Sequence, residues 1–249
     1  NDVHGHLQGD GSSAVGIDYV AALHAATPNS LLVDAGDATQ GMPVVSLSKG
    51  ASAIELMNAA GYDAMCLGNH EFDFGQEVLL TNAEAAEFPM LSANVVRTES
   101  GDVLLAGVGA CGDGATAVLE CAGRHIGVFG ITTASTSHST SPANVEGLQF
   151  EDEVETARRC IADLAAQGVD AIVALCHLGD GPVSCRAVDL AAELEPEEAA
   201  KLCAIVDGHS HTVENIEVNG VLVAQTGCNL ANVGKLTLAF DADGSVSAI

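Results

Sequence analysis

Short apolar runs alternate with amphipathic stretches along most of the chain, and glycines stand at many of the junctions. Apolar residues at helical spacing predict helices over 17–26, 52–60 and 152–167, the last two being followed directly by Gly61 and Gly168. Brief runs of consecutive apolar residues are typical of buried strands, and we expect strands at 31–33, 64–67, 90–93, 103–108, 125–131, 171–176, 205–206, 221–225 and 235–240. Strands that alternate with helices indicate a layered α/β fold.

Length and composition are those of an ordered domain. The chain has 249 residues, enough for one large domain with a sizeable core, and 48% of them are hydrophobic, with a mean hydropathy of +0.28. It contains no run of about 18 apolar residues, so we expect no membrane-spanning helix. No signal-peptide pattern is present, because the chain opens directly on polar residues at Asn1.

Acidic residues dominate the charge. The chain has 34 Asp and Glu against 8 Lys and Arg, for a formal net charge of −26. Such a surface repels nucleic acid and anionic membranes at long range, so we expect no nucleic-acid polymer as a partner. It is also typical of a solubility or high-salt adaptation. An anionic substrate would need strong local positive charge, which bound metal ions can supply.

Eight cysteines are scattered along the chain without a CxxC pair, which argues against a zinc finger or a thioredoxin-like motif. Cys66 and Cys176 lie inside apolar runs, and we expect both to be buried thiols. Spacing alone leaves disulfides open. The pairs that could be bridged are Cys111 with Cys121 and Cys185 with Cys203.

Residues that suit metal binding recur at the carboxyl ends of the expected strands. Ligands of α/β sheets bind outside these ends, so groups that are distant in sequence would converge on one rim. Imidazole and carboxylate groups suit Zn, Mn, Fe or Ni, and one Asp carboxylate can bridge two cations. Two cations about 3.5–4 Å apart would clamp a phosphate and activate a bridging water. The residues are Asp2 and His4 at the N-terminus, Asp37, Asn69, His70, His177, His209 and His211.

Each of these signals also has a purely structural interpretation. A Gly-Asp pair such as Gly36-Asp37 is typical of a turn, and His177 after an apolar strand is typical of a strand-end histidine. His209 and His211 share one side only if the segment between them is extended. The hypothesis of a metal site depends on the conjunction of these residues, in order, at successive strand ends.

With these residues the chain resembles the metallophosphoesterase superfamily, specifically its 5′-nucleotidase branch, over nearly its whole length. The segment 68–75 (GNHEFDFG) resembles the most specific signature of that family. The other matching segments are 1–6 (NDVHGH), 34–41 (DAGDATQG), 91–94 (LSAN), the strand end at His177 and 207–212 (DGHSHT). The resemblance implies a four-layer α/β/β/α sandwich of the calcineurin-like type, with residues 1–249 forming the catalytic domain.

The resemblance also implies a role for each site residue. Two divalent metal ions, which could be Mn, Zn, Fe, Mg or Co, would be held by two sets of side chains and one bridging carboxylate. The first set is Asp2, His4 and His211, the second is Asn69, His177 and His209, and the bridge is Asp37. His70 would be the catalytic histidine facing the phosphate, oriented by Asp73, and Asn69 would also touch the phosphate. Glu71 and Phe72 are expected to lock the loop rather than to react.

The implied activity is 5′-nucleotidase-type cleavage of nucleoside monophosphates or related nucleotides by a metal-bridging hydroxide. The same motifs occur in 2′,3′-cyclic nucleotide phosphodiesterases and nucleotide-sugar hydrolases, so the sequence does not separate these substrates. The resemblance implies an extracellular, cell-surface or periplasmic location. It also implies a C-terminal domain that binds the nucleotide, which we expect in the full-length protein but not in this chain. The chain has no Trp, 2 Tyr and 6 Phe, so it offers little aromatic surface for stacking a base.

Two interpretations from other functional classes remain. A surface or interaction module could keep this fold without catalysis, but every expected ligand position is filled by a suitable residue type. A purely structural metal domain is disfavoured, because structural zinc sites prefer shells rich in thiolates and none of the candidate ligands is a cysteine.

Overall fold

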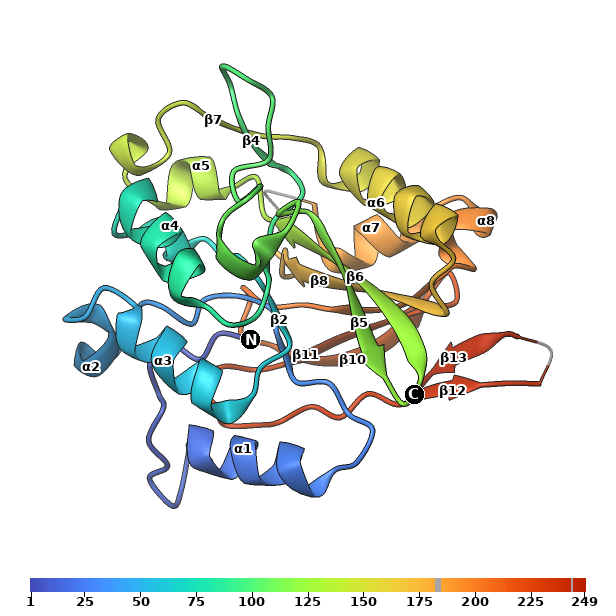
Figure 1. Cartoon of the computed structure of the whole chain (residues 1–249), viewed down its shortest axis with the longest axis horizontal. Coiled ribbons are helices and arrows are strands. Elements are labelled where there is room, and N and C mark those ends of the chain that lie inside the picture. Colours follow the sequence, from blue (N-terminus) through green and yellow to red (C-terminus); the bar gives the residue numbers. More distant parts are fainter. Residues whose placement is uncertain (182–184, 243) are drawn as a thin grey trace.

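The computed structural model describes residues 1–181, 185–242 and 244–249 (Figure 1). The helices are α1 (Ile17–Ala26), α2 (Pro43–Ser46), α3 (Ala51–Ala60), α4 (Gln76–Ala85), α5 (Thr136–Ser139), α6 (Glu153–Gln167), α7 (Ala187–Glu193) and α8 (Pro196–Ala199), with 3₁₀ turns η1 (His70–Phe72), η2 (Gly109–Cys111) and η3 (Pro142–Asn144). The strands are β1 (Val33–Asp34), β2 (Ala64–Cys66), β3 (Met90–Leu91), β4 (Val95–Arg97), β5 (Thr116–Cys121), β6 (Arg124–Thr132), β7 (Leu148–Phe150), β8 (Ala171–His177), β9 (Leu202–Val206), β10 (Val213–Val218), β11 (Val221–Thr226), β12 (Leu238–Phe240) and β13 (Val246–Ala248).

Two sheets form the centre of the molecule. One is a small parallel sheet in the order β1-β2-β3. The other has the order β10-β11-β9-β8-β6-β5; its inner strands are parallel, and β10 and β5 pair antiparallel at its two edges. The pairs β4-β7 and β12-β13 are separate antiparallel ribbons. The carboxyl ends of the parallel strands are therefore available to build a common rim.

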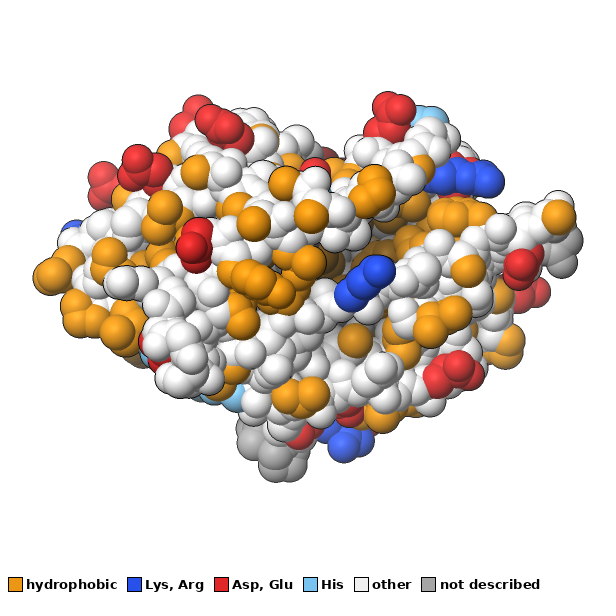
Figure 2. Space-filling view, turned by 90° about the horizontal axis from the view of Figure 1, so that it is seen from below, with side chains coloured by type: hydrophobic (Ala, Val, Ile, Leu, Met, Phe, Trp, Pro, Cys, Tyr) orange, Lys and Arg blue, Asp and Glu red, His pale blue; other side chains and the backbone are white. Residues whose placement is uncertain are grey.

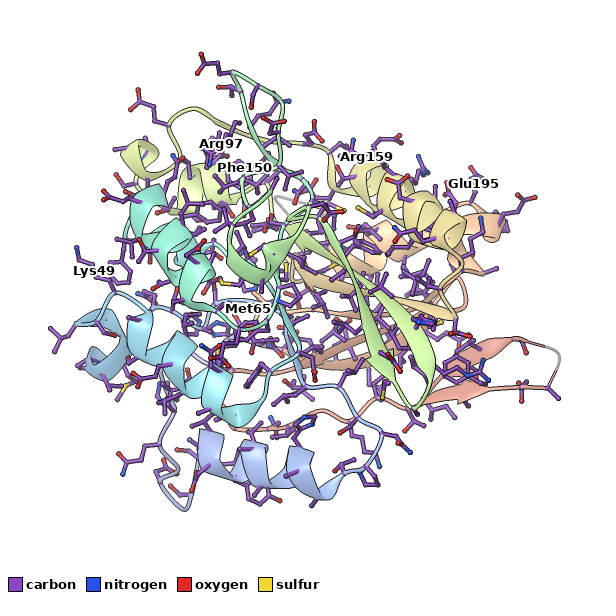
Figure 3. All side chains as sticks on the ribbon, viewed as in Figure 1. Lys49, Met65, Arg97, Phe150, Arg159 and Glu195 are labelled. Carbon is purple, nitrogen blue, oxygen red and sulfur yellow. The ribbon has the colours of Figure 1, made fainter. Side chains whose placement is uncertain are left out.

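Side chains point alternately to the two faces of the central strands, and this divides the buried apolar residues into three hydrophobic cores. On β2, Met65 packs with α1, α3 and α4, whereas Ala64 and Cys66 face the larger sheet (Figure 3). On β8, Ile172 packs with α6 and α7, whereas Val173 faces the smaller sheet. Successive residues of a strand point to opposite faces, so each sheet is covered by helices on one side and by the other sheet on the other. This arrangement confirms the predicted four-layer α/β/β/α sandwich.

The expected helices over 17–26, 52–60 and 152–167 are confirmed to within one residue at each end. The expected strand at 103–108 is wrong. Leu104 and Leu105 are buried in the core beneath α4, but the backbone around them forms turns, in which Ala106 N–H donates to Val103 O and Val108 N–H donates to Leu105 O. A run of apolar residues indicates that a segment is buried, and a buried turn gives the same pattern as a buried strand.

All eight cysteines lie in the described part of the chain and are free, so neither bridge considered for Cys111 or Cys185 is formed. Cys66 and Cys176 are fully buried as expected, and burial raises the pKa of both thiols well above the usual value. Acidic side chains are dispersed over the face shown in Figure 2, where basic side chains are few. Among the described residues, no helix combines the length and apolar character needed to cross a bilayer.

Candidate metal centre

The loops at the carboxyl ends of the strands bring the predicted residues together. Asp37 follows β1, Asn69 and His70 follow β2, His177 ends β8, and His209 and His211 follow β9. The first residues of the chain run beside the loop after β1, because Asp2 N–H donates to Gly36 O at 2.8 Å and His4 N–H donates to Asp37 O at 3.0 Å. The side chain of Asn1 is also tied to the loop after β11, where its amide donates to Gly227 O at 2.7 Å.

The candidate ligand atoms form two neighbouring groups. One is Asp2 with His4 and His211, the other is Asp37 with His177 and His209, and within each group the atoms lie within 4.8 Å of one another. The separation is 3.1 Å between the Nε2 atoms of His4 and His211, and 3.0 Å from His177 Nε2 to Asp37 Oδ2.

The two carboxylates join the groups. Asp37 Oδ2 also lies 3.9 Å from His4 Nε2, and Asp2 Oδ1 lies 4.0 Å from His177 Nε2. Each carboxylate therefore lies near an imidazole of the opposite group.

Two buried polar atoms make the site fit for cations. Asn69 Oδ1 has no hydrogen-bond partner among the residues that the structure describes, and His177 Nε2 faces only the carboxylate of Asp37, at 3.0 Å and without good hydrogen-bond geometry. A buried polar atom without a partner destabilises the fold by about 1–3 kcal/mol, and metal coordination removes that cost. Imidazole, carboxylate and amide oxygen together form a donor set suited to divalent ions of the first transition row. The residues present thus fit a metal-binding site.

The backbone at the site is strained. Asp37, His209 and His211 adopt left-handed φ values of 61°, 80° and 60°, and Asp2 and His4 adopt 50° and 46°. Non-glycine residues seldom take this conformation, and such strain clusters at functional sites, where surrounding contacts maintain it. Close approach of the loops adds a further constraint, because a Cβ at Gly68 would lie 2.2 Å from Asp37 Oδ1.

Burial and neighbouring charges shift the pKa values of the groups around His177. The Nδ1–H of His177 donates to Ala35 O at 2.6 Å, which directs Nε2 toward Asp37. Burial acts to lower the pKa of His177, but the nearby carboxylates of Asp37 and Asp2 outweigh it and raise the pKa to about 10. Burial alone would raise the pKa of Asp37, yet His177 holds it well below its usual range. Burial lowers the pKa of His4 and of His209, which favours the neutral form of both imidazoles.

Two buried acids organise the loops. The carboxylate of Glu71 accepts hydrogen bonds from the backbone N–H groups of Gly68, Asp37 and Thr39, at 2.7, 2.8 and 3.0 Å, which joins the loops after β1 and β2. This agrees with the locking role expected for Glu71. Asp207 accepts from the N–H groups of Leu178 and Gly179, at 2.8 and 2.9 Å, and so joins the loops after β8 and β9.

Sequence reasoning assigned no role to Asp207. Burial raises the pKa of Asp207 to about 7. The available signal was an acid placed directly after an apolar strand and before a glycine, a position where a carboxylate can accept from neighbouring loop amides.

Replacing Glu71 by glutamine is expected to lower the free energy of unfolding by about 2–4 kcal/mol, because the amide group would face backbone donors that then lack an acceptor. Chemical denaturation with and without metal measures this effect. Glu77→Gln, at an exposed position on α4, is the matched control and should stay within about 0.5 kcal/mol of the parent. Equal stability of both variants would contradict the organising role of Glu71.

His70 lies beside the first group of donors and makes the predicted pair with Asp73. Its Nδ1 lies 2.6 Å from Asp73 Oδ2, and its backbone N–H donates to Asp37 Oδ1 at 2.8 Å. The ring packs edge-on against His4, with centroids 5.3 Å apart. Burial acts to lower the pKa of His70, but Asp37 and Asp73 outweigh it and raise the pKa above its usual value. The imidazole can therefore carry a proton next to the candidate metal groups.

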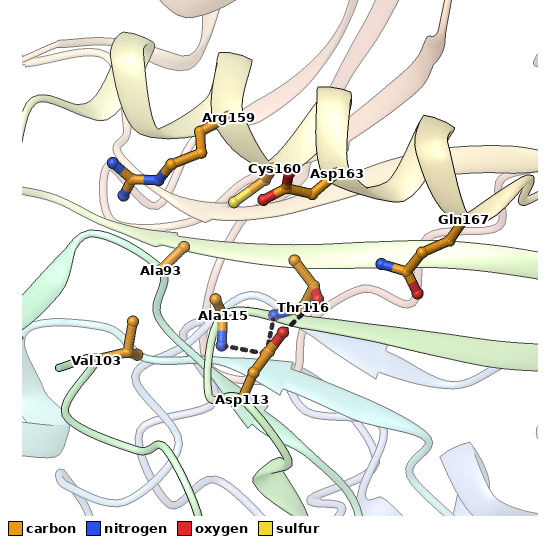
Figure 4. Close-up of a pocket in the computed structure, with 9 residues that line it drawn as sticks. All are labelled: Ala93, Val103, Asp113, Ala115, Thr116, Arg159, Cys160, Asp163 and Gln167. Carbon is orange, nitrogen blue, oxygen red and sulfur yellow. Dashed lines mark hydrogen bonds between the residues drawn. The ribbon is translucent and has the colours of Figure 1, made fainter.

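A separate cavity of about 370 Å³ lies between α6 and the start of β5 (Figure 4). Its lining residues are Ala93, Val103, Asp113, Ala115, Thr116, Arg159, Cys160, Asp163 and Gln167. None of the predicted site residues is among them, so this cavity is distinct from the candidate metal centre.

Comparison with known proteins gives consistent matches. A family model described as calcineurin-like phosphoesterase matches residues 1–213. A probable 5′-nucleotidase of Treponema pallidum (strain Nichols) is 36% identical over 195 residues, covering 72% of this chain and 32% of that protein. A 5′-nucleotidase precursor from Thermus thermophilus matches the whole chain with a TM-score of 0.77 and 29% identity. The NAD nucleotidase of Haemophilus influenzae does so with a TM-score of 0.80 and 27% identity. This chain covers 53% of each of these two solved chains and about a third of the curated relative.

Proposed function

This chain belongs to the calcineurin-like phosphoesterase family, and on that basis we propose that it hydrolyses phosphoesters of nucleotides with the help of two divalent metal ions. The observation that carries the proposal is the pair of donor groups joined by two carboxylates, with Asn69 Oδ1 buried and lacking a partner among the described residues. Asp2, His4 and His211 would hold one ion, Asn69, His177 and His209 the other, and Asp37 would contact both.

The bound ions would supply positive charge for the phosphate and an activated water as the nucleophile. His70 would contribute the remaining chemistry from the chain itself. With Nδ1–H donated to Asp73, its Nε2 is left to hold a proton against a phosphate oxygen or the leaving oxygen. The buried amide of Asn69 would also contact the phosphate. Metal ions held at this site would supply local positive charge, which would allow a protein with a net charge of −26 to bind an anion.

Nucleoside monophosphates are the proposed substrates, because the similar proteins named above are a probable 5′-nucleotidase, a 5′-nucleotidase precursor and an NAD nucleotidase. Cyclic nucleotides and nucleotide sugars are alternatives within the same chemistry, and a catalytically silent interaction module is the alternative outside it. An extracellular, cell-surface or periplasmic location is also part of the proposal, on the ground of the family resemblance.

Metal stoichiometry and turnover together test the proposal. The purified chain should bind about two equivalents of Mn²⁺ or Zn²⁺ and hydrolyse AMP, with activity lost on chelation and restored by metal. A 2′,3′-cyclic nucleotide, a nucleotide sugar and single-stranded DNA serve as competing substrates. No metal binding and no turnover would support the silent module, and preferential cleavage of DNA would overturn the choice of small nucleotides.

We expect this chain to discriminate poorly between nucleotides. Because it has few aromatic side chains to stack a base, kcat/KM for AMP and for a simple aryl phosphate should agree within about tenfold. Steady-state kinetics on AMP, CMP and p-nitrophenyl phosphate measures the selectivity. A preference of more than about a hundredfold for one base would contradict this expectation.

A further inference from the structure

Asp73 is held on both of its carboxylate oxygens. Oδ2 lies 2.6 Å from His70 Nδ1, and Oδ1 accepts a hydrogen bond from the hydroxyl of Thr140 at 3.0 Å. Thr140 directly follows α5 and lies 67 positions from Asp73 in the sequence. The segment after β6 therefore reaches the loop after β2 and contacts the group that orients His70.

The chemistry of the amide, hydroxyl and carboxylate groups determines which atom donates and which accepts in each of these hydrogen bonds. The amide nitrogen of Asn144 can only donate, and it donates to Thr140 Oγ1 at 3.3 Å and to Asp73 O at 2.9 Å. The hydroxyl of Thr140 thus accepts from Asn144 and has its own proton free for Asp73 Oδ1. Aligned hydrogen bonds of this kind strengthen one another. Each carboxylate oxygen of Asp73 then has one donor, which orients the carboxylate toward His70.

Hydrogen bonds from helix α4 hold the segment that contains Thr140 and Asn144. Gln76 at the start of α4 donates through its amide to Asn144 O at 3.2 Å and to Glu146 O at 2.9 Å. Residues 140–146 are thereby tied to the loop that carries His70 and Asp73 and to helix α4, which follows that loop. Thr140 is half-buried, so its hydroxyl bond to Asp73 is only partly exposed to competition from water.

We propose that Thr140 is a positioning residue for His70: its hydroxyl holds Asp73 so that the carboxylate fixes the Nδ1–H tautomer of His70 and leaves Nε2 facing the substrate. The proposal rests on the proposed function for its catalytic consequence, but the tautomer of His70 can be observed without turnover. Fixing the tautomer through a hydrogen-bonded carboxylate is how a positioned imidazole acquires a defined direction for proton transfer.

Thr140→Val removes the hydroxyl and keeps the shape of the side chain. We expect kcat for AMP to fall about tenfold with KM within a factor of about two, because an interaction that matters in the transition state lowers kcat. Thr140→Ser retains the hydroxyl and should restore at least half of the parent kcat. The matched control is Thr98→Val, which removes a hydroxyl bond to Gly147 O in the neighbouring ribbon and should leave kcat unchanged.

Two readouts separate positioning from a merely structural role. In a His70→Ala background, Thr140→Val should cost no further activity, because the residue acts through His70. Histidine ¹⁵N spectra of the metal-free protein are recorded at a pH where His70 is neutral, and its signal is identified by its loss in His70→Ala. They should show a protonated Nδ1 in the parent and in Thr140→Ser, and a mixed population in Thr140→Val.

An unchanged tautomer together with an unchanged kcat in Thr140→Val would overturn the positioning role. So would an equal loss of activity in the parent and in the His70→Ala background. If the parent protein hydrolyses no phosphoester with any metal, the proposed function fails. The ¹⁵N spectra then still decide whether Thr140 orients His70, because they do not depend on activity.

Discussion

The Asp37→Ala variant is expected to lose phosphoester hydrolysis by more than about a thousandfold, together with most of its bound metal. Removing one stabilising donor from an active site commonly lowers kcat by about 10²–10³-fold. Asp37 belongs to the second group of donors, and its Oδ2 also lies 3.9 Å from His4 Nε2 in the first, so its loss would affect both of the proposed ions at once. Metal content after gel filtration and kcat/KM on an aryl phosphate measure the two effects.

Asp37→Asn separates charge from shape in the same experiment. The amide oxygen can still accept from the backbone N–H of His70, so the loop should stay folded. The variant lacks the negative charge and one of the two carboxylate oxygens that could bind a metal ion, so metal binding should still fall strongly. The matched control is Asp113→Asn, an exposed carboxylate that caps a turn at Ala115 and Thr116, and it should keep both metal and activity. Retention of about two metal equivalents and of activity within tenfold in Asp37→Ala would refute the shared role of Asp37.

The placement of the site could be predicted because it follows from where strands stop. Polar residues after apolar runs at Asp37, Asn69, His177 and His209 pointed to one rim, and the structure brings the side chains of Asp37, His177 and His209 into one group. The division into two groups was not available from spacing and came only from the family resemblance. It depends on how the loops cross in space, which local patterns do not encode.

Local sequence patterns did not predict several other features of the structure. Helix α4 was missed because Thr81 and Asn82 interrupt its apolar stripe, although Leu79 and Ala83 are buried on one face. Edge strands β5 and β10 were missed because polar residues interrupt their apolar positions and none of their side chains is fully buried. The hydroxyl bond from Thr140 to Asp73 joins segments 67 residues apart and has no signature in either one.

The strained backbone at the metal centre illustrates the same limit. Asp2, His4 and Asp37 adopt left-handed conformations that are uncommon for non-glycine residues, although Asp and His adopt them more often than most other types. The residue types alone therefore do not predict this geometry, and the contacts around it are needed to explain it. Glu71 provides part of that explanation, because its carboxylate accepts from the Asp37 N–H and from other amides of the same loop.

His70→Ala is expected to lower kcat by about 10²–10⁴-fold while leaving metal content unchanged. The His70 ring lies outside both groups of candidate ligands, and it is directed by Asp73 rather than by a metal-facing carboxylate. Its loss therefore removes proton transfer and charge at the substrate without removing a metal ligand. Single-turnover kinetics and metal analysis on the same sample measure the two quantities together.

His70→Asn provides a stricter version of this test. The asparagine amide can occupy the place of Nδ1–H and keep the hydrogen bond to Asp73, but it offers nothing at the position of Nε2. Equal losses in His70→Ala and His70→Asn would assign the effect to the missing Nε2, since the second variant preserves the loop contacts around Asp73. Parent-like hydrolysis by either variant would show that the reaction does not need His70. Loss of metal in both would instead make His70 part of the metal centre, contrary to the role inferred here.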